Sequence, residues 1–272
     1  MRRLQTFCLT TGLMFAFGAS AALAAIIPTP EALERQSGTR PVTLTVVEPH
    51  LSTPKNPVEV TYLVFPAPVA LAAALGPNWA ARPKVIEFHA LDGYVSRIDV
   101  ARLTSGKAYF AFARADHSPF TADNLAQNEK NVPLGPYYLV WDNRSDPKLL
   151  AAGAHDWPYQ VDDVSFSRDS DAALRPPGFD PALEPGLSNV KAECLTCHEV
   201  NGYGGEKAGG NLAAVARGLT MSDFVKWVLE PSAVKPDTKM PALSPRLPEA
   251  ERRAIVDSIY KYLSQVPVVP GP

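Results

Sequence analysis

The residues best suited to chemistry in this chain form the pentapeptide Cys194-Leu195-Thr196-Cys197-His198. Two thiols three positions apart can add to the two vinyl groups of one porphyrin, and the histidine that follows can bind its iron. A redox dithiol and half of a zinc site are the alternatives. A redox dithiol is expected beside a βαβ pattern, and a zinc site needs about four ligands. The chain has neither that pattern nor a second Cys/His pair, so the pentapeptide predicts one covalently bound haem c.

A haem iron also needs a ligand on its second face, and few soft side chains are available for this role. Between residues 186 and 268 the only histidine is His198, and the only methionines are Met221 and Met240. We interpret Met221, at the expected start of a helix, as a packing residue. Met240 precedes Pro241 in a loop, where the proline can hold the thioether in place. We therefore expect His198 and Met240 to be the axial ligands; a five-coordinate or lysine-ligated iron is the alternative.

Such a pair of ligands indicates what the haem is for. With both axial positions filled, substrates reach the iron poorly, and a thioether ligand raises the reduction potential. The protein then supplies ligation, burial and docking while the cofactor carries the electron. The expected chemistry is one-electron transfer.

The start of the chain resembles an export signal. Two arginines precede an apolar run from Leu9 to Leu23, which ends in an A-x-A cleavage pattern at Ala24. We expect residues 1–24 to be a signal peptide, with the mature protein in the periplasm and no permanent membrane anchor; a retained anchor helix is the alternative. Cleavage leaves Cys194 and Cys197 as the only cysteines.

Composition limits the classes of partner. The chain has 272 residues, 46% hydrophobic residues and a formal net charge of −2. Loss of the two leader arginines would change this charge to −4, because residues 1–24 contain no acid. A mildly acidic protein without a basic tract is not expected to bind nucleic acid. The expected partners are redox proteins.

Periodicity divides the mature chain into two parts. Residues 25–167 alternate as strands do, and 168–185 is a proline-rich linker. Residues 186–268 form a second domain, with helices expected at 220–230 and 248–263. In the first domain we expect a short helix at 69–75 and a polar loop at 116–133, and we expect strands at 42–47, 58–65, 84–90, 95–100, 108–113, 137–141 and 159–166.

The second domain resembles a class I c-type cytochrome across residues 184–268. The resemblance is carried by the C-x-x-C-H pentapeptide, by Met240-Pro241 and by Tyr262-Leu263 near the C-terminus. It implies an all-α domain in which the last helix crosses the first, and it implies the same covalent haem with His198 and Met240 as iron ligands.

The first domain weakly resembles the sulfite-oxidase-type molybdopterin-binding domain. Val85–Tyr94 is similar to that family's D-G-Y strand and turn, and Leu134–Trp141 is similar to a later strand. The resemblance implies a sheet-rich α+β fold. Enzymes of that family hold molybdenum partly by a cysteine thiolate, whereas residues 25–193 contain no cysteine. We therefore expect the fold without the molybdenum.

The remaining polar residues suggest no further site. The histidines share no ligand spacing, and Asp92 and Tyr94 are interpreted as turn and core residues. The expected function is a periplasmic mono-haem c-type cytochrome, either a soluble carrier or the haem subunit of a redox complex, with the first domain as docking module and no catalytic residue. The alternatives are a dehydrogenase whose active site lies in the first domain, with haem as electron acceptor, and a haem sensor with an open iron site.

Overall fold

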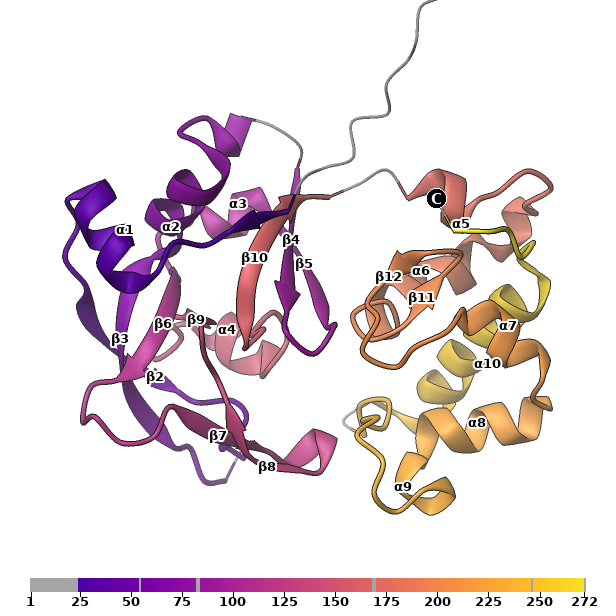
Figure 1. Cartoon of the computed structure of the whole chain (residues 1–272). Helices are drawn as coiled ribbons and strands as arrows, with labels where there is room; N and C mark the ends of the chain where they lie inside the picture. The colour runs from indigo at the N-terminus through magenta and orange to yellow at the C-terminus, as the bar shows by residue number, and fades with distance from the viewer. Residues whose placement is uncertain (1–23, 54, 82–83, 168–169, 246, 272) are drawn as a thin grey trace, which may run out of the picture.

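The computed structural model describes residues 24–53, 55–81, 84–167, 170–245 and 247–271. The ribbon forms two lobes (Figure 1), which we call the N-terminal lobe, up to residue 167, and the C-terminal lobe, from residue 170. The expected signal peptide lies outside the described residues except for Ala24. No helix among the described residues is long and apolar enough to cross a membrane.

Two four-stranded antiparallel sheets form the N-terminal lobe. The first has the order β1-β10-β4-β5 and the second the order β2-β3-β6-β9. The strands of the first are Ala25–Ile26 (β1), Val161–Phe166 (β10), Val85–Ala90 (β4) and Val95–Asp99 (β5). Those of the second are Val42–Val47 (β2), Glu59–Pro66 (β3), Ala108–Arg114 (β6) and Tyr138–Trp141 (β9). Each of the seven strands expected in this lobe is present, with its ends displaced by at most two residues.

The alternating pattern of β3 shows why these segments form half-buried strands. Val60, Tyr62 and Val64 are buried, while Thr61 and Leu63 between them are partly exposed. Successive side chains of a strand point to opposite faces of the sheet, so this alternation buries one face. The buried faces of both sheets share one hydrophobic cluster that extends from Ile27 to Val164.

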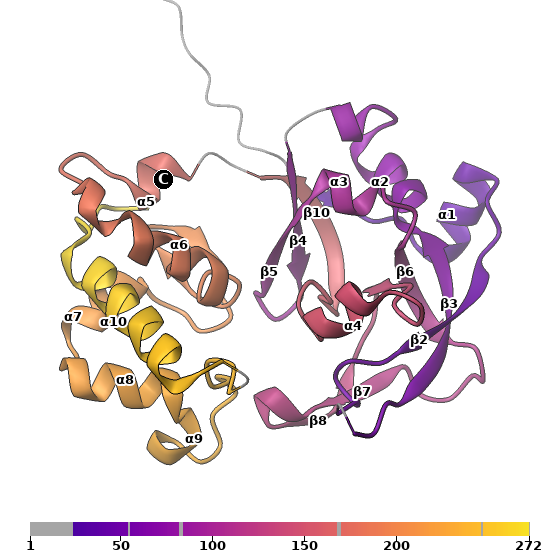
Figure 2. The same cartoon turned by 180° about the vertical axis from the view of Figure 1, so that it is seen from behind.

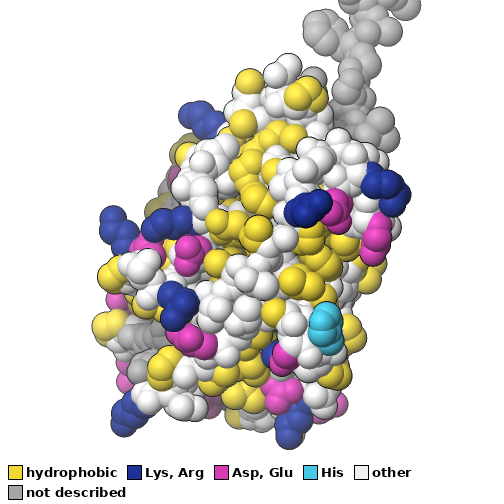
Figure 3. Space-filling view, turned by 90° about the vertical axis from the view of Figure 1, so that its left-hand side faces the viewer, with side chains coloured by type: hydrophobic (Ala, Val, Ile, Leu, Met, Phe, Trp, Pro, Cys, Tyr) yellow, Lys and Arg dark blue, Asp and Glu magenta, His cyan; other side chains and the backbone are white. Residues whose placement is uncertain are grey.

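Short helices and one extra hairpin complete the N-terminal lobe. The helices are Pro30–Ser37 (α1), Ala67–Leu75 (α2), Trp79–Ala81 (η1), Val100–Leu103 (α3), Leu125–Gln127 (η2) and Pro147–Ala152 (α4). The hairpin pairs Thr121–Asn124 (β7) with Glu129–Pro133 (β8), so the expectation of a loop at 116–133 is wrong. Figure 3 shows a band of hydrophobic side chains on the outer face of this lobe. Val69 and Ala72 of α2 line a shallow groove.

Helices dominate the C-terminal lobe. They are Asp171–Leu174 (α5), Pro181–Leu183 (η3), Glu184–Glu193 (α6), Leu212–Arg217 (α7), Met221–Leu229 (α8), Pro231–Val234 (α9) and Glu249–Gln265 (α10). Helix α6 packs so closely on α10 that a Cβ at Gly186 would overlap the carbonyl of Ser258 and the side chain of Tyr262. This lobe has its own hydrophobic cluster, which extends from Ala173 to Val266.

The expected fold class, a sulfite-oxidase-like α+β domain followed by an all-α class I cytochrome c domain, is wrong. Helices occur along the whole described chain, and the C-terminal lobe contains a two-stranded antiparallel sheet of Glu199–Val200 (β11) and Tyr203–Gly204 (β12). The physical reason is the turn between them. Asn201 and Gly202 have φ angles of 53° and 77°, as in the two-residue turn that Asn-Gly favours in hairpins.

The hairpin turn is also an anchor for both ends of the C-terminal lobe. The Asn201 side chain is buried, and its amide donates hydrogen bonds to the carbonyls of Ala173 (2.8 Å) and Pro267 (3.0 Å). Its carbonyl oxygen accepts from the Asn211 amide at 2.8 Å and from the backbone N–H of Val269 at 3.2 Å. One side chain therefore joins the segment before α6, the hairpin and the segment after α10.

Candidate functional site

The pentapeptide forms a tight turn directly after α6. The backbone N–H of Cys194 still donates to the carbonyl of Val190 at 2.9 Å, as in the last turn of the helix. The Cys194 carbonyl then accepts from the N–H groups of Cys197 at 3.2 Å and His198 at 3.0 Å. The chain thus folds back on itself within five residues, which keeps the two thiols and the imidazole close in sequence and in space.

Both cysteines of the C-terminal lobe are free and partly buried. Burial raises the pKa of the Cys194 thiol to about 12, and it raises the pKa of Cys197 as well, although the hydroxyl of Thr196 acts in the opposite direction. The thiols are therefore protonated near neutral pH. Two unpaired thiols in one turn meet the requirement for two thioether bonds.

His198 is partly buried, and its ring has no hydrogen-bond partner among the residues that the structure describes. Burial lowers its pKa, so the ring is neutral at pH 7 and each nitrogen can be a donor or a ligand according to the tautomer. Metal-ligating histidines usually hold their second nitrogen by a hydrogen bond. The protein here leaves both nitrogens available.

Two glycines close the following loop onto the pentapeptide. The N–H of Gly205 lies 2.9 Å from the Leu195 carbonyl and 3.0 Å from that of His198. A Cβ at Gly204 would overlap the His198 carbonyl, and one at Gly205 would overlap the Thr196 carbonyl. Only glycine fits where residues 204–205 contact the pentapeptide, and this contact holds the backbone of the pentapeptide in its turn.

The expected second ligand, Met240, lies in a loop held at two points. Its backbone N–H donates to the Thr238 hydroxyl at 3.2 Å, and three residues later Leu243 donates to the Val228 carbonyl of α8 at 2.9 Å. Met240 is partly buried against the same hydrophobic cluster as Cys194. Met221 also borders that cluster, where it packs at the first position of α8.

The N-terminal lobe contacts the backbone of the pentapeptide. The hairpin of β4 and β5 faces the C-terminal lobe in both views (Figures 1 and 2). The N–H of Val95 donates to the Thr196 carbonyl at 2.8 Å, and the Arg97 guanidinium donates to the Leu195 carbonyl at 3.1 Å. In the reverse direction Glu206 donates to the Gly93 carbonyl at 2.8 Å. The D-G-Y turn thus has a role that the sequence interpretation missed.

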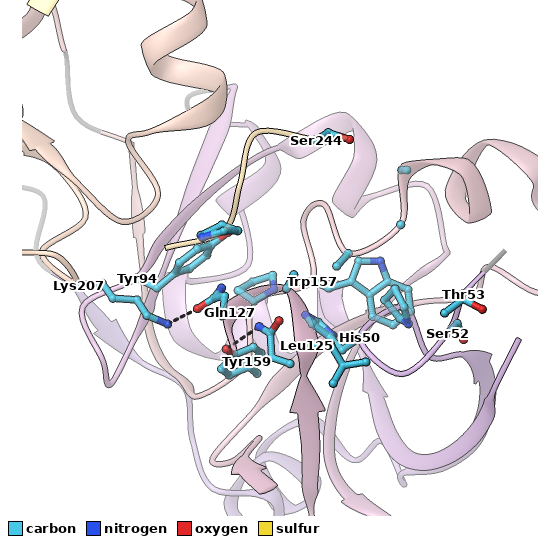
Figure 4. A pocket seen from close by; sticks show the side chains of 18 of the residues that line it. His50, Ser52, Thr53, Tyr94, Leu125, Gln127, Trp157, Tyr159, Lys207 and Ser244 are labelled. Carbon is cyan, nitrogen blue, oxygen red and sulfur yellow. Dashed lines mark hydrogen bonds between the residues drawn. The ribbon is translucent and has the colours of Figure 1, made fainter. Parts of the chain in front are cut away.

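A cavity of about 540 Å³ opens beside this contact, between loops of both lobes (Figure 4). Tyr94 and Lys207 enter it from one side, and His50 and Trp157 lie on the other. The lining includes three aromatic rings, one histidine, one lysine and one residue of the methionine loop: Tyr94, Trp157, Tyr159, His50, Lys207 and Pro241.

His50 is held by a buried carboxylate. Glu48 is fully buried, and its Oε1 lies 3.0 Å from Nδ1 of His50. The hydroxyls of Tyr62 and Tyr138 donate to the same carboxylate at 2.7 and 2.8 Å. Burial raises the pKa of Glu48, but hydrogen bonds from His50, Tyr62 and Tyr138 outweigh it, so the pKa is lowered overall. Glu48 is ionised at neutral pH.

Sequence reasoning did not select this pair. Glu48-Pro49-His50 follows β2 directly, but two residues of this type after a strand are too common to indicate a site. The other histidines of the N-terminal lobe do not join it: His89 lies near Ser165, and His117 and His155 are exposed. Among the described residues, no group of three or more His, Cys, Asp or Glu side chains could hold a metal ion.

Comparison with known proteins gave no relative. No family model matches the chain, and no curated protein matches it. The C-terminal lobe is not all-α, and the described residues contain no metal-binding group of side chains of the kind just named. The expected membership of class I c-type cytochromes, with a sulfite-oxidase-type domain before it, is therefore wrong, and function has to be argued from the site alone.

Proposed function

We propose that this chain is an exported mono-haem protein of the c type that carries single electrons in the periplasm. One observation carries the proposal: a tight turn presents two free thiols and, directly after them, a neutral imidazole whose nitrogens are unpartnered within the described residues. These donors fit a covalently attached haem, which requires two thioether bonds and one axial nitrogen.

Each residue has a defined task in this function. Cys194 and Cys197 would hold the porphyrin through their sulfur atoms, and His198 would bind the iron from the side of the turn. Met240 would supply a thioether as a second ligand to the iron. When bound, the haem supplies a one-electron couple between ferric and ferrous iron. The chain contributes a buried, closely packed setting in which ligands stay in place when the charge changes.

The N-terminal lobe has a structural task in the same proposal. Its β4–β5 hairpin binds the backbone of the pentapeptide through Val95 and Arg97, which limits the surface from which a partner can approach. Electron exchange would therefore involve redox partner proteins that dock beside this lobe.

Removal of the thiols tests the attachment. In the exported protein, Cys194→Ala with Cys197→Ala should abolish haem that survives denaturation, because no other cysteine remains in the mature chain. Haem staining after denaturing electrophoresis measures this. Cys8→Ala, within the leader, is the matched control and should keep full staining. Covalent haem in the double variant would refute the proposal.

Replacement of the methionine tests the second ligand. Met240→Ala should leave haem attached and lower the reduction potential, since a thioether ligand raises it. Redox titration followed by absorbance measures the potential. Met221→Leu, which borders the same hydrophobic cluster, is the control and should leave the potential unchanged. An unchanged potential in Met240→Ala would exclude Met240 as ligand.

A dehydrogenase with its active site in the N-terminal lobe is the second candidate function. The cavity that contains His50 favours it, because this cavity adjoins the contact between Tyr94 and the pentapeptide segment. In that function a substrate would reduce the haem within one molecule. Rapid reduction of the haem by a substrate, lost in Ala154→Phe at the cavity wall, would distinguish an enzyme from a carrier.

A further inference from the structure

The cavity between the lobes is lined by a buried histidine whose ring, within the described residues, is bonded at one nitrogen only. The His50 side chain is only 7% exposed. Its Nδ1 contacts Glu48 and the Tyr138 hydroxyl, each at 3.0 Å, whereas its Nε2 has no hydrogen-bond partner among the described residues. Since His50 lines the cavity, this nitrogen is a buried lining group with hydrogen-bonding capacity to spare.

The environment of Nδ1 determines what Nε2 can do. Glu48 is ionised and accepts from the backbone N–H of His50 at 3.1 Å as well as from the ring. A carboxylate on Nδ1 favours a proton on that nitrogen, so Nε2 is the acceptor nitrogen whenever the ring carries a single proton. The Tyr138 hydroxyl donates to the same Glu48 oxygen, which fixes the ring from a second direction. The cavity thus presents a fixed acceptor to a ligand hydroxyl.

The charges in the lining are already compensated. Apart from His50, the charged lining residues are Asp92 and Lys207, whose atoms lie 2.7 Å apart. Lys207 also donates to the Gln127 side-chain carbonyl at 2.8 Å, as drawn in Figure 4. An anion or a cation would have to break this pair. An uncharged ligand leaves it intact.

The other polar side chains offer little to a sugar. The Asn124 amide donates to the Tyr159 hydroxyl at 3.1 Å, and Gln127 is engaged by Lys207. A ligand with many hydroxyls needs a partner for each hydroxyl that it buries, and half of the polar groups of Asn124 and Gln127 are already used. By contrast, three aromatic rings, those of Tyr94, Trp157 and Tyr159, line the space, and the ring of Tyr159 lies edge-on to His50 with centroids 5.6 Å apart.

We propose that this cavity binds a small, uncharged aromatic molecule bearing a hydroxyl group, which donates its hydrogen bond to Nε2 of His50. The aromatic ring lies among the three aromatic side chains, which favour offset or edge-on contact. A volume of about 540 Å³ is within the range of small-molecule sites and accommodates one or two fused rings. The lining includes Pro241, next to the proposed ligand Met240, so this site adjoins the proposed haem site but uses different side chains.

Calorimetric titration of the purified full-length mature protein with matched probes tests the proposal. We expect 2-naphthol to bind one per chain, and 2-methoxynaphthalene, which has the same rings but no hydroxyl donor, to bind about tenfold more weakly. Naphthalene-2-carboxylate and glucose should bind more weakly still. Equal affinity for naphthol and its methyl ether, or tighter binding of the carboxylate or of glucose, would overturn the proposal.

Two variants locate the site. His50→Phe should remove the preference for naphthol over its methyl ether, and His117→Asn, at an exposed histidine with φ of 60° where asparagine is tolerated, should retain it. Ala154→Phe fills the cavity wall without touching the Glu48 hydrogen bonds and should abolish binding of both probes, even if His50→Phe is poorly folded. Unchanged naphthol affinity in Ala154→Phe would refute the site. Haem staining of the same samples reports separately on the proposed electron-transfer function.

Discussion

Two buried histidines of this molecule are held in opposite ways. His50 in the N-terminal lobe has its Nδ1 engaged by the fully buried Glu48, which three side chains in turn satisfy. His198 in the C-terminal lobe lies in a turn whose backbone makes hydrogen bonds to α6, to the following loop and to the N-terminal lobe, but its ring is unpartnered within the described residues. The first ring is oriented by the protein for an external hydroxyl. The second ring is the one that we propose as an iron ligand.

The difference shows two ways in which a fold can hold a histidine side chain in place. In the N-terminal lobe the side chain is oriented directly, through hydrogen bonds to a buried charge. In the C-terminal lobe the backbone is oriented instead, by glycines that allow the loop to close and by the hairpin of the other lobe. The predictions below alter each of these two arrangements in turn.

The largest effect is expected at the buried carboxylate. Glu48→Leu removes the acceptor shared by His50, Tyr62 and Tyr138 and leaves the buried Tyr62 hydroxyl without its partner. Loss of one partner from a buried charged network costs about 3–5 kcal/mol. Urea unfolding, followed by circular dichroism, measures the free energy of unfolding. Glu59→Gln breaks only the exposed pair with Arg144, and its cost should stay below about 1 kcal/mol. Similar costs for the two variants would mean that Glu48 does not organise the lobe.

The second effect is expected where the glycine loop contacts the backbone of the pentapeptide. Gly205→Ala places a Cβ against the Thr196 carbonyl, so the loop has to move away from the pentapeptide. We expect a loss of about 3 kcal/mol in the stability of the C-terminal lobe, together with less attached haem. Gly218→Ala is the control, because its Cβ would lie 3.4 Å from the nearest atom, the Val215 carbonyl. A fully stable Gly205→Ala would show that the loop can yield.

The third effect is a pH dependence at Glu48. Its pKa in the folded protein is lowered from the usual 4.5, so its ionised form contributes stability above pH 4.5, and this contribution is lost as the pH falls through the folded-state pKa. The difference in unfolding free energy between wild type and Glu48→Gln should therefore be constant between about pH 7 and 8 and shrink below 4.5. Urea unfolding at each pH measures it. A difference that does not change on acidification would contradict ionisation of Glu48.

The smallest effect is expected at Lys239–Glu129, an ion pair that joins the lobes in addition to Asp92–Lys207. Lys239 lies 2.6 Å from Glu129, but its side chain is 66% exposed. Exposed pairs contribute roughly 0–1 kcal/mol, and salt screens them. Lys239→Gln should cost no more than this, with Lys235→Gln in the same loop as control. A cost several times larger would show that this pair, rather than the β4–β5 hairpin, holds the lobes together.

The sequence predicts the molecule best where one periodicity dominates. The strand at 42–47 is observed at Val42–Val47, and the helices at 220–230 and 248–263 are observed at Met221–Leu229 and Glu249–Gln265. Apolar residues recur there at the spacing of a single regular element. The pentapeptide is also evident from the sequence, because its chemistry depends on local spacing.

The features that escaped prediction depend on turns or on distant partners. The β11–β12 hairpin has only two residues in each strand, which is too short for a pattern of alternating apolar and polar residues. Asn201-Gly202 is its one local signal in the sequence. The network at Glu48 joins residues from three different strand regions, among them Tyr62 and Tyr138. Such long-range contacts leave no periodic trace in the sequence.

The anchor at Asn201 has a consequence for the order of events during biogenesis. Its side chain bonds carbonyls at 173 and 267 and a backbone N–H at 269, so these bonds form only after nearly the whole polypeptide has been synthesised. Until then the hairpin that follows the pentapeptide lacks the hydrogen bonds to residues 267 and 269. A chain that stops before residue 267 would lack two of the four hydrogen bonds of the Asn201 side chain, so the last residues complete the C-terminal lobe around this hairpin.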